Sequence, residues 1–517
     1  MTTSAPPLLP TTSPSIYDRR MSRVRSSPVL ARRIDLWAPI AVTLLAALAR
    51  FANLGHPQAV VFDETYYVKD SWSQWNLGYT AKWPDGADEA FASGDPSGFL
   101  TEASFSVHPP LGRWLIGAGM WLFGADSAFG WRFSVALFGT ATVLLVYLVA
   151  KTLTGSTPLA TVAGFLLAID GLSIVLSRVA LLDGLLAFFT LLAFWFVLLD
   201  RRRHPARLAA RLDLSADDPP PWGPVLWNRP WLFAAGAAAG AATGVKWSGL
   251  YVLAALGVYA VVADALARRR LGVLYWPADA IRQGAVSFVL LVPVAFVVYL
   301  ASWTGWLVSS GGWDRQSGAT DAATGFWAWV PTPLQSLWNY HEAMYAFHVG
   351  LSTPHGYESP AWQWPLLVRP TSMFWEQDGD TVQAVSSIPN PLLWWAGVAA
   401  AALLAVLFVR RRDWRAAFVL TAITATYLPW LMYPERTIFQ FYTVVIAPFL
   451  VLAIALAARE VAGAPAASVE RRLSGQRVVW TFLIVVTVLS AFWYPVWSAI
   501  PVPYDFWRLH NWLPTWV

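Results

Sequence analysis

Long apolar stretches recur along this chain, and they constrain its fold more than any other feature. Each has the ~17–25 residues that a helix needs to cross the hydrocarbon core of a bilayer. The chain is 56% hydrophobic and only 13% charged, whereas soluble domains are about a quarter charged. Such a chain needs lipid as its solvent. The expected spans are 36–54, 129–150, 157–176, 180–199, 231–248, 249–266, 283–303, 391–409, 415–432, 438–458 and 478–497.

The loops between these spans predict the orientation of the chain. If the N-terminus is cytoplasmic, every second loop is basic, from a single lysine (Lys151) to clusters of arginine, as the positive-inside rule requires. Eleven spans then place the C-terminus outside. The predicted regions are a disordered cytoplasmic N-terminus (1–35), a transmembrane module (36–303) with a first outer loop (55–128), a second outer loop (304–390), C-terminal transmembrane helices (391–497) and an extracytoplasmic tail (498–517).

Composition excludes several classes of function. The chain has no cysteine, so disulfides and thiolate metal sites are impossible. Its net charge of +5 lies in short loops between apolar spans, which indicates membrane orientation and not nucleic-acid binding. No segment has the pattern of a nucleotide-binding domain. We therefore expect membrane lipids as partners, no nucleic acid and no cofactor.

Two adjacent acids follow the first span. Asp63 and Glu64 lie between the apolar "VVF" and an aromatic pair that includes Tyr67. A carboxylate near the bilayer surface loses hydration, which raises its pKa and suits it to act as a base. An ordinary solvated acid pair is the alternative. Further along the same loop, His108 begins the stiff segment "HPP", ahead of a short apolar helix.

Ionisable residues also occur inside or at the ends of apolar spans. They are Arg132, Arg178, Asp183 and Lys246. Each costs ~2.5–3.5 kcal/mol at the centre of a membrane, so each needs a partner or a task. Arg178 could pair with Asp183, although five residues is a poor spacing on one helix. Arg132 and Lys246 both lie near the predicted outer face, where together they could hold a phosphate.

The second outer loop and a later turn contain further polar candidates. His341, His348 and His355 are seven residues apart, which is not the spacing of a helical metal site. We expect these histidines to bind a polar substrate and not a metal. Trp362 and Trp364 offer faces for stacking on sugar or peptide. Glu435 and Arg436 occupy a tight outer turn, where a local ion pair is the alternative to a role in binding.

These motifs together resemble the protein O-mannosyltransferases, integral membrane enzymes of the GT-C glycosyltransferase class. The resemblance covers nearly all of the membrane portion, and its shorter second loop is similar to that of actinobacterial members. It implies an all-α polytopic GT-C fold with about eleven transmembrane helices and two large extracytoplasmic loops carrying interfacial helices. It rests on "FDETYY", "HPPLGRWLI", "GWRF", "SRVALLDGLLAFF", "GAATGVKWSGL", "YHEAMYAFHVGLSTPHGYESPAWQWPLLVRP" and "PERTIFQFY", in this order.

The resemblance also implies a reaction. Family members transfer mannose from a polyprenyl-phosphate carrier to Ser or Thr hydroxyls of polypeptides crossing the membrane, and the anomeric carbon inverts. The acid pair would be catalytic, with Asp63 as the base. Arg132, Lys246 and Arg178 would bind the donor phosphate without a metal. The acceptor or substrate would contact Tyr67, His108, Asp183, His341, His348, His355, Trp362, Trp364, Glu435 and Arg436.

The expected location is the plasma membrane, with the site on the extracytoplasmic side. Three alternatives remain open. A different GT-C enzyme would use the same donor class on a lipid or a cell-wall polymer. A transporter would show internal repeats and broken spans at mid-membrane, neither of which is evident. A scaffold protein would not need several charges inside the membrane.

Overall fold

The computed structural model describes residues 15–212, 219–464 and 466–517, and most of these residues are helical. Eight of the described helices are long and apolar enough to cross a membrane. Their apolar runs carry few charges, and their outward faces remain exposed because lipid is their solvent. They are α2 (Pro28–Phe51), α6 (Ala128–Thr154), α9 (Leu182–Ala209), α11 (Gly249–Arg270), α12 (Trp276–Ser302), α16 (Pro391–Arg411), α17 with η3 (Trp414–Met432) and α19 (Val469–Trp497).

Three of the eleven expected spans form shorter helices, so the count of eleven is not confirmed. The stretch 157–176 is divided between α7 (Thr157–Ala168) and α8 (Gly171–Val175). The other two are α10 (Pro230–Val245) and α18 (Ala447–Ala462), which follows the 3-10 turn η4 (Gln440–Val445). The N-terminal segment also differs from expectation, because α1 (Ile16–Ser26) is a helix capped by Ser15. Residues 1–14 lie outside the described residues.

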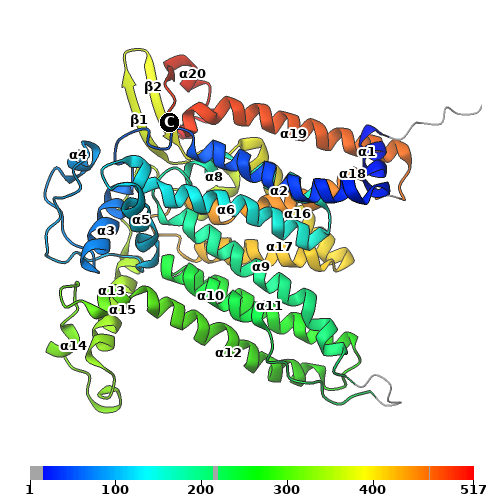
Figure 1. Ribbon diagram of the computed structural model, residues 1–517, viewed down its shortest axis with the longest axis horizontal. Coiled ribbons are helices and arrows are strands. Elements are labelled where there is room, and N and C mark those ends of the chain that lie inside the picture. The colour runs from blue at the N-terminus through cyan, green and yellow to red at the C-terminus, as the bar shows by residue number, and fades with distance from the viewer. Residues whose placement is uncertain (1–14, 213–218, 465) are drawn as a thin grey trace, which may run out of the picture.

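The helices pack as one bundle, with the two large loops gathered at one end of it (Figure 1). Helix α10 lies between α9 and α12. Its glycines Gly236 and Gly240 face the backbone of α12, where an added Cβ of Gly236 would come within 2.7 Å of the Leu291 carbonyl. Small residues four apart allow two membrane helices to approach closely. This packing places the C-terminal end of α10, and hence Lys246, beside the start of α9.

The loop end contains short helices and one small sheet. Strand β1 (Ser372–Asp378) pairs antiparallel with β2 (Thr381–Ser386), and β2 pairs with β3 (Val502–Pro503). Gly379 adopts a φ of 58° in the two-residue turn between β1 and β2, a conformation that favours glycine. The remaining short elements are α3 (Glu64–Leu77), α4 (Ala87–Ala92), α5 (Leu111–Phe123), α13 (Thr304–Val308), α14 (Ser317–Thr320), η1 (Gly325–Trp327), α15 (Thr332–Gly350), η2 (Ala361–Leu366), α20 (Tyr504–Arg508) and η5 (Pro514–Trp516).

Candidate active site

Asp63 is the residue immediately before α3, at the loop end of the bundle. The preceding Phe62 has a φ of 50°, and its ring packs edge-on against Phe439 and Phe441 at 5.9 and 5.6 Å. A non-glycine residue in this conformation persists only where its surroundings hold it. The Asp63 carboxylate makes no capping bond to α3, and within the described residues it has no hydrogen bond or ion pair. The chain therefore fixes the backbone of Asp63 and leaves its carboxylate unused.

Burial raises the pKa of Asp63 to about 6, while Lys246 lowers it and Asp183 raises it further. A carboxylate with this pKa is mostly ionised at neutral pH. It is also a far better proton acceptor than an ordinary aspartate, because catalytic efficiency is greatest when the pKa lies near the working pH. Its unused oxygen atoms are therefore available to a substrate hydroxyl.

Unlike the carboxylate of Asp63, that of Glu64 is fully occupied by hydrogen bonds and an ion pair. It pairs with Arg132 through Nε–Oε1 and Nη2–Oε2 contacts of 2.8 and 2.9 Å. It also accepts hydrogen bonds from the backbone N–H groups of Val61 and Ala180, at 3.0 and 2.8 Å. Both side chains of the ion pair are buried. Glu64 thus joins the first outer loop to α6 and to the segment before α9.

Arg132 has no donor left for a ligand. Its other N–H groups bond the carbonyl oxygens of Leu54, Pro57 and Ala59 at 3.4, 2.9 and 2.9 Å. With the two contacts to Glu64, these bonds occupy all five donors of a guanidinium. A phosphate could bind Arg132 only by breaking this network. The geometry therefore favours a structural role for Arg132.

Arg178 also bonds backbone oxygens. Its Nη1 donates to the carbonyl oxygens of Arg50 and Ala52 at 2.9 and 2.7 Å, and its Nη2 donates to Asn53 at 3.1 Å. These carbonyls end α2, where a helix leaves oxygens without partners and favours a positive charge. Arg178 does not pair with Asp183. Its contacts stabilise the turn that leads from α2 towards Asp63.

Lys246 and Asp183 form an ion pair near enough to Asp63 for both charges to act on its pKa. The Lys246 ammonium donates to both carboxylate oxygens of Asp183 at 2.9 and 2.8 Å, and it lies 4.8 Å from the ring centre of Tyr442. Asp183 is in the first turn of α9, where the helix dipole favours an anion. Lys246 and Asp183 line a small open hollow of about 20 Å³, together with Tyr251, Trp430 and Tyr442.

Two histidines and one arginine form a second polar group beside this pair. Arg436 donates to Nδ1 of His348 at 3.0 Å, and Nε2 of His348 lies 2.7 Å from the carbonyl oxygen of Val107. Nε2 therefore carries the proton. Burial and the nearby Arg436 lower the pKa of His348 to about 4, so its ring is neutral. His108 stacks on His348 at 5.1 Å and lies 6.2 Å from the ring of Tyr67.

Several polar atoms of this group have no partner within the described residues. They include the buried His108 Nδ1 and Arg436 Nε. Burial, Lys246 and His348 lower the pKa of His108 well below its usual value, and burial together with Asp63 raises that of Tyr67 well above its own. Buried polar atoms without partners are costly, so a polar ligand that bonded them would be stabilised here.

The other two predicted histidines lie outside the group formed by His108, His348 and Arg436. His341 bonds Tyr299 and the Leu337 carbonyl at 2.5 and 2.6 Å, and it stacks on Trp247 at 5.7 Å. His355 lies against Phe62 at 6.2 Å. No cluster of described residues has the composition of a metal site.

The tryptophan and glutamate candidates differ in how far they are exposed. Trp364 is buried in the core and donates to the Ser359 carbonyl at 2.8 Å, so its faces are not open for stacking. Trp362 is 62% exposed. Glu435 is exposed and forms no ion pair with Arg436 within the described part of the chain.

Sequence reasoning missed three contributors to the site. Tyr442 and Trp430 line the hollow, but aromatic residues are too frequent in this chain to stand out. Arg113 is the third, and its place in "HPPLGR" was the available signal. It is buried and donates to the His108 carbonyl at 3.0 Å, to Gln74 at 2.9 Å and to Ser106. It therefore fixes the position of His108.

Comparisons with known proteins converge on one family. Residues 40–216 match the family described as dolichyl-phosphate-mannose-protein mannosyltransferase, and residues 333–516 match the C-terminal four-TMM region of protein-O-mannosyltransferase. A polyprenol-phosphate-mannose–protein mannosyltransferase of Mycolicibacterium smegmatis (strain MKD8) is 35% identical over 94% of this chain and 93% of its own length. A protein of the same name from Corynebacterium glutamicum is 28% identical over 94% of each chain.

Solved structures share the fold. The Saccharomyces cerevisiae protein O-mannosyltransferase Pmt1–Pmt2 complex, bound to the sugar donor, has a chain that matches with a TM-score of 0.71 at 15% identity, over 98% of this chain and 94% of that one. The archaeal oligosaccharyltransferase AglB from Archaeoglobus fulgidus matches with a TM-score of 0.50 at 16% identity, over 89% of this chain and 56% of its own. The architecture is thus that of membrane glycosyltransferases.

Proposed function

This chain belongs to the protein O-mannosyltransferase family, and we propose that it transfers mannose from a polyprenyl-phosphate carrier to Ser or Thr hydroxyls of polypeptides. The names of its relatives support the donor and the reaction. The observation that carries the proposal is the unused carboxylate of Asp63, whose pKa is about 6, beside the Lys246–Asp183 pair. The site offers a base and a cation together, as a transfer from a phosphate carrier requires.

In the proposed reaction, the acceptor hydroxyl attacks the anomeric carbon while Asp63 takes its proton. The new bond joins the hydroxyl oxygen to that carbon, and the bond from the carbon to the phosphate oxygen breaks. The lipid phosphate leaves with the electron pair. One displacement inverts the anomeric carbon, so no covalent intermediate with the enzyme forms. The attack therefore comes from the face opposite the leaving phosphate.

We propose that Lys246 and Arg436 stabilise the negative charge that develops on the leaving phosphate. Each has capacity beyond the partners described above: an ammonium has three donors, of which Asp183 can occupy two, and Nε of Arg436 is unpartnered. Charged donors already held in place stabilise a leaving anion without reorganisation during the reaction. This assignment replaces Arg132 and Arg178, whose donors bond Glu64 and backbone oxygens. Glu64 then positions Asp63 and does not act on substrate.

The arginine-rich ends of α9 and α11 lie far from Asp63. Asp183 and His204 are 21 residues apart on α9, which is about 30 Å along the helix at 1.5 Å per residue. By the positive-inside rule, we propose that this basic end is cytoplasmic and that the site lies on the extracytoplasmic face. The acceptor would then be a polypeptide during or after translocation.

The proposal can be tested with purified protein, polyprenyl-phosphate-mannose and a Ser/Thr-rich peptide. Wild-type protein should mannosylate the peptide, and replacing Ser and Thr by Ala should abolish transfer. A lipid extract offered in place of the peptide tests the alternative acceptor. Transfer to lipid with none to peptide would contradict the proposed acceptor and leave the donor assignment intact.

A further inference from the structure

A second cavity lies at the basic end of the bundle, far from Asp63. Its volume is about 300 Å³, and its lining comes mainly from α9 and α11. Its walls are mostly apolar, and Leu266 is partly exposed on the outer surface of the bundle. Arg201 and Arg270 also line it. An apolar wall with cations beside it matches the two parts of a lipid, an acyl chain and a charged head group.

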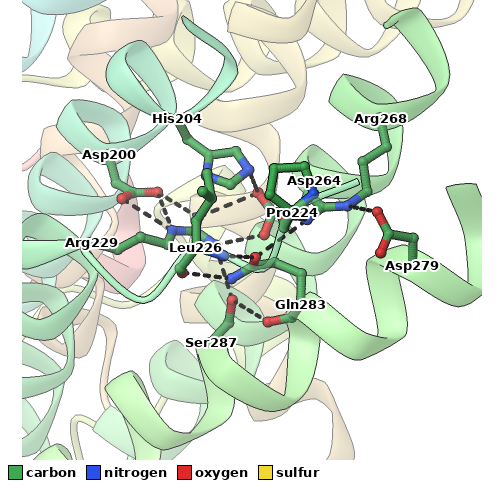
Figure 2. Close-up of polar contacts among 10 residues, drawn as sticks. All are labelled: Asp200, His204, Pro224, Leu226, Arg229, Asp264, Arg268, Asp279, Gln283 and Ser287. Carbon is green, nitrogen blue, oxygen red and sulfur yellow. Dashed lines mark hydrogen bonds and ion pairs between the residues drawn. The ribbon is translucent and has the colours of Figure 1, made fainter. Parts of the chain in front are cut away.

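The floor of the cavity is a closed ion-pair network (Figure 2). Arg229 donates to Asp200 at 2.5 Å and to Asp264 at 2.6 Å, and also to Ser287 on α12 at 3.0 Å. Nε2 of His204 lies 3.0 Å from Asp264. These groups are buried. Because Asp200 and Asp264 both pair with Arg229, the arginines at the sides of the cavity are left for a ligand.

Arg201 is held in position by aromatic rings. Its guanidinium carbon lies 4.5 Å from the ring centre of Trp414 on α17 and 5.8 Å from that of Tyr259 on α11. Stacking uses the face of a guanidinium and leaves N–H groups at its edge, which match a phosphate. No carboxylate among the described residues pairs with Arg201.

His204 supplies an independent sign of a ligand. Its Nδ1 is buried, and no described residue bonds it, although the side chain lines the cavity. Helix α9 contains Pro205 directly after this histidine. A polar atom that is buried without a partner at the wall of a cavity is satisfied when something polar enters.

We propose that this cavity binds an anionic phospholipid, with Arg201 and Arg270 on its phosphate and an acyl chain along the apolar wall. Basic pockets between transmembrane helices are a known mode of binding anionic head groups. The orientation proposed above would draw this lipid from the cytoplasmic leaflet. The lipid would join α9 to α11, and α17 would take part through Trp414.

Full-length protein in detergent tests this with three probes, which are phosphatidylglycerol, phosphatidylcholine and inorganic phosphate. Phosphatidylglycerol should be retained in native mass spectra and should raise the melting temperature. The variant R201Q/R270Q should weaken its binding at least tenfold. The control R202Q/R269Q removes the same charge from the same end of the bundle, outside the cavity lining, and should stay within twofold of wild type.

Equal weakening by the two double variants would overturn the proposal, because it would indicate diffuse attraction. Equal binding of phosphatidylcholine, or full protection by inorganic phosphate alone, would overturn it as well. If R201Q/R270Q does not fold, A263F serves instead, since it fills the apolar wall without changing charge. Loss of phosphatidylglycerol from A263F would support the site, and unchanged binding would contradict it.

Discussion

Among the residues described, buried aspartates are paired at the basic end of the bundle, whereas at the loop end Asp63 is not. At the basic end, Arg229 places its donors on Asp200, Asp264 and Ser287, so one network joins α9, α11 and α12. At the loop end, Asp63 has no partner within the described chain. Charges that are paired in full hold helices together, whereas a charge without a partner keeps its reactivity. Whether a buried charged residue has a partner therefore indicates its role, structural or catalytic, better than its residue type does.

The largest effect should come from breaking the network at the basic end. The variant R229Q leaves Asp200 and Asp264 buried without their cation, and removing one partner of a buried ion pair costs about 3–5 kcal/mol. We expect a large fall in melting temperature or a loss of folded protein. Transfer per folded molecule should stay near wild type. R202Q on the exposed face of α9 is the control. Wild-type stability in R229Q would show that the network is dispensable.

The next effect concerns the donor. In K246Q the leaving phosphate loses a charge-assisted hydrogen bond, which is worth about 1.5–3 kcal/mol, or roughly ten- to a hundredfold in kcat/KM for the donor. Because Asp183 also loses its partner, the double variant D183N/K246Q serves as a control with no uncompensated charge. It should recover stability without recovering donor use. Recovery of donor use would show that the pair acts only through structure.

A smaller effect concerns pH. Since burial raises the pKa of Asp63 to about 6, kcat/KM should be level above pH 7 and fall about tenfold for each unit below pH 6, as the base becomes protonated. Stability should change in the opposite sense. A carboxyl whose pKa is higher in the folded state binds more protons there, so its contribution to folding improves as pH falls from about 6 towards 4. A flat rate profile between pH 5 and 8 would exclude this base.

D63N should show that stability effect directly. It removes the cost of burying an ionised carboxylate, so at pH 7.5 it should melt at or above the wild-type temperature. The difference should shrink towards pH 5, where wild-type Asp63 is largely protonated. Thermal unfolding of both proteins across this pH range measures the effect. D85N, at an exposed loop position, is the matched control.

The sequence predicted the membrane class and the location of the acid pair, because span length, basic loops and the "FDETYY" motif are local signals. The resemblance already named Asp63 as the base, but no local pattern predicted that the Glu64 carboxylate would be fully paired. Asp63 ends a loop and Glu64 begins a helix, and the partners of Glu64 are Arg132 and Ala180, 68 and 116 residues away. The contact between Arg436 and His348 spans 88 residues. Contacts of this kind depend on helix packing, which no local pattern contains.

The same limit explains the assignments that changed. Arg132 and Arg178 were linked to phosphate because a charge near a membrane face needs a partner. Glu64 and loop carbonyl oxygens meet that need for Arg132, and carbonyl oxygens at the end of α2 meet it for Arg178. Trp364 was assigned to stacking because it lies in a loop, yet it is buried in the core. The strands β1 and β2 were not foreseen, since an isolated hairpin inside a long loop gives no repeated signal.

The central claim is that of two adjacent acids, the unpartnered one carries the chemistry and the paired one carries the structure. The most direct measurement compares D63N and E64Q for mannose transfer per folded molecule and for melting temperature. We predict that D63N loses about 10²–10⁴-fold in rate with no loss of stability, and that E64Q melts much lower while its folded fraction retains most of its activity. A stable, inactive E64Q beside an active D63N would contradict the account.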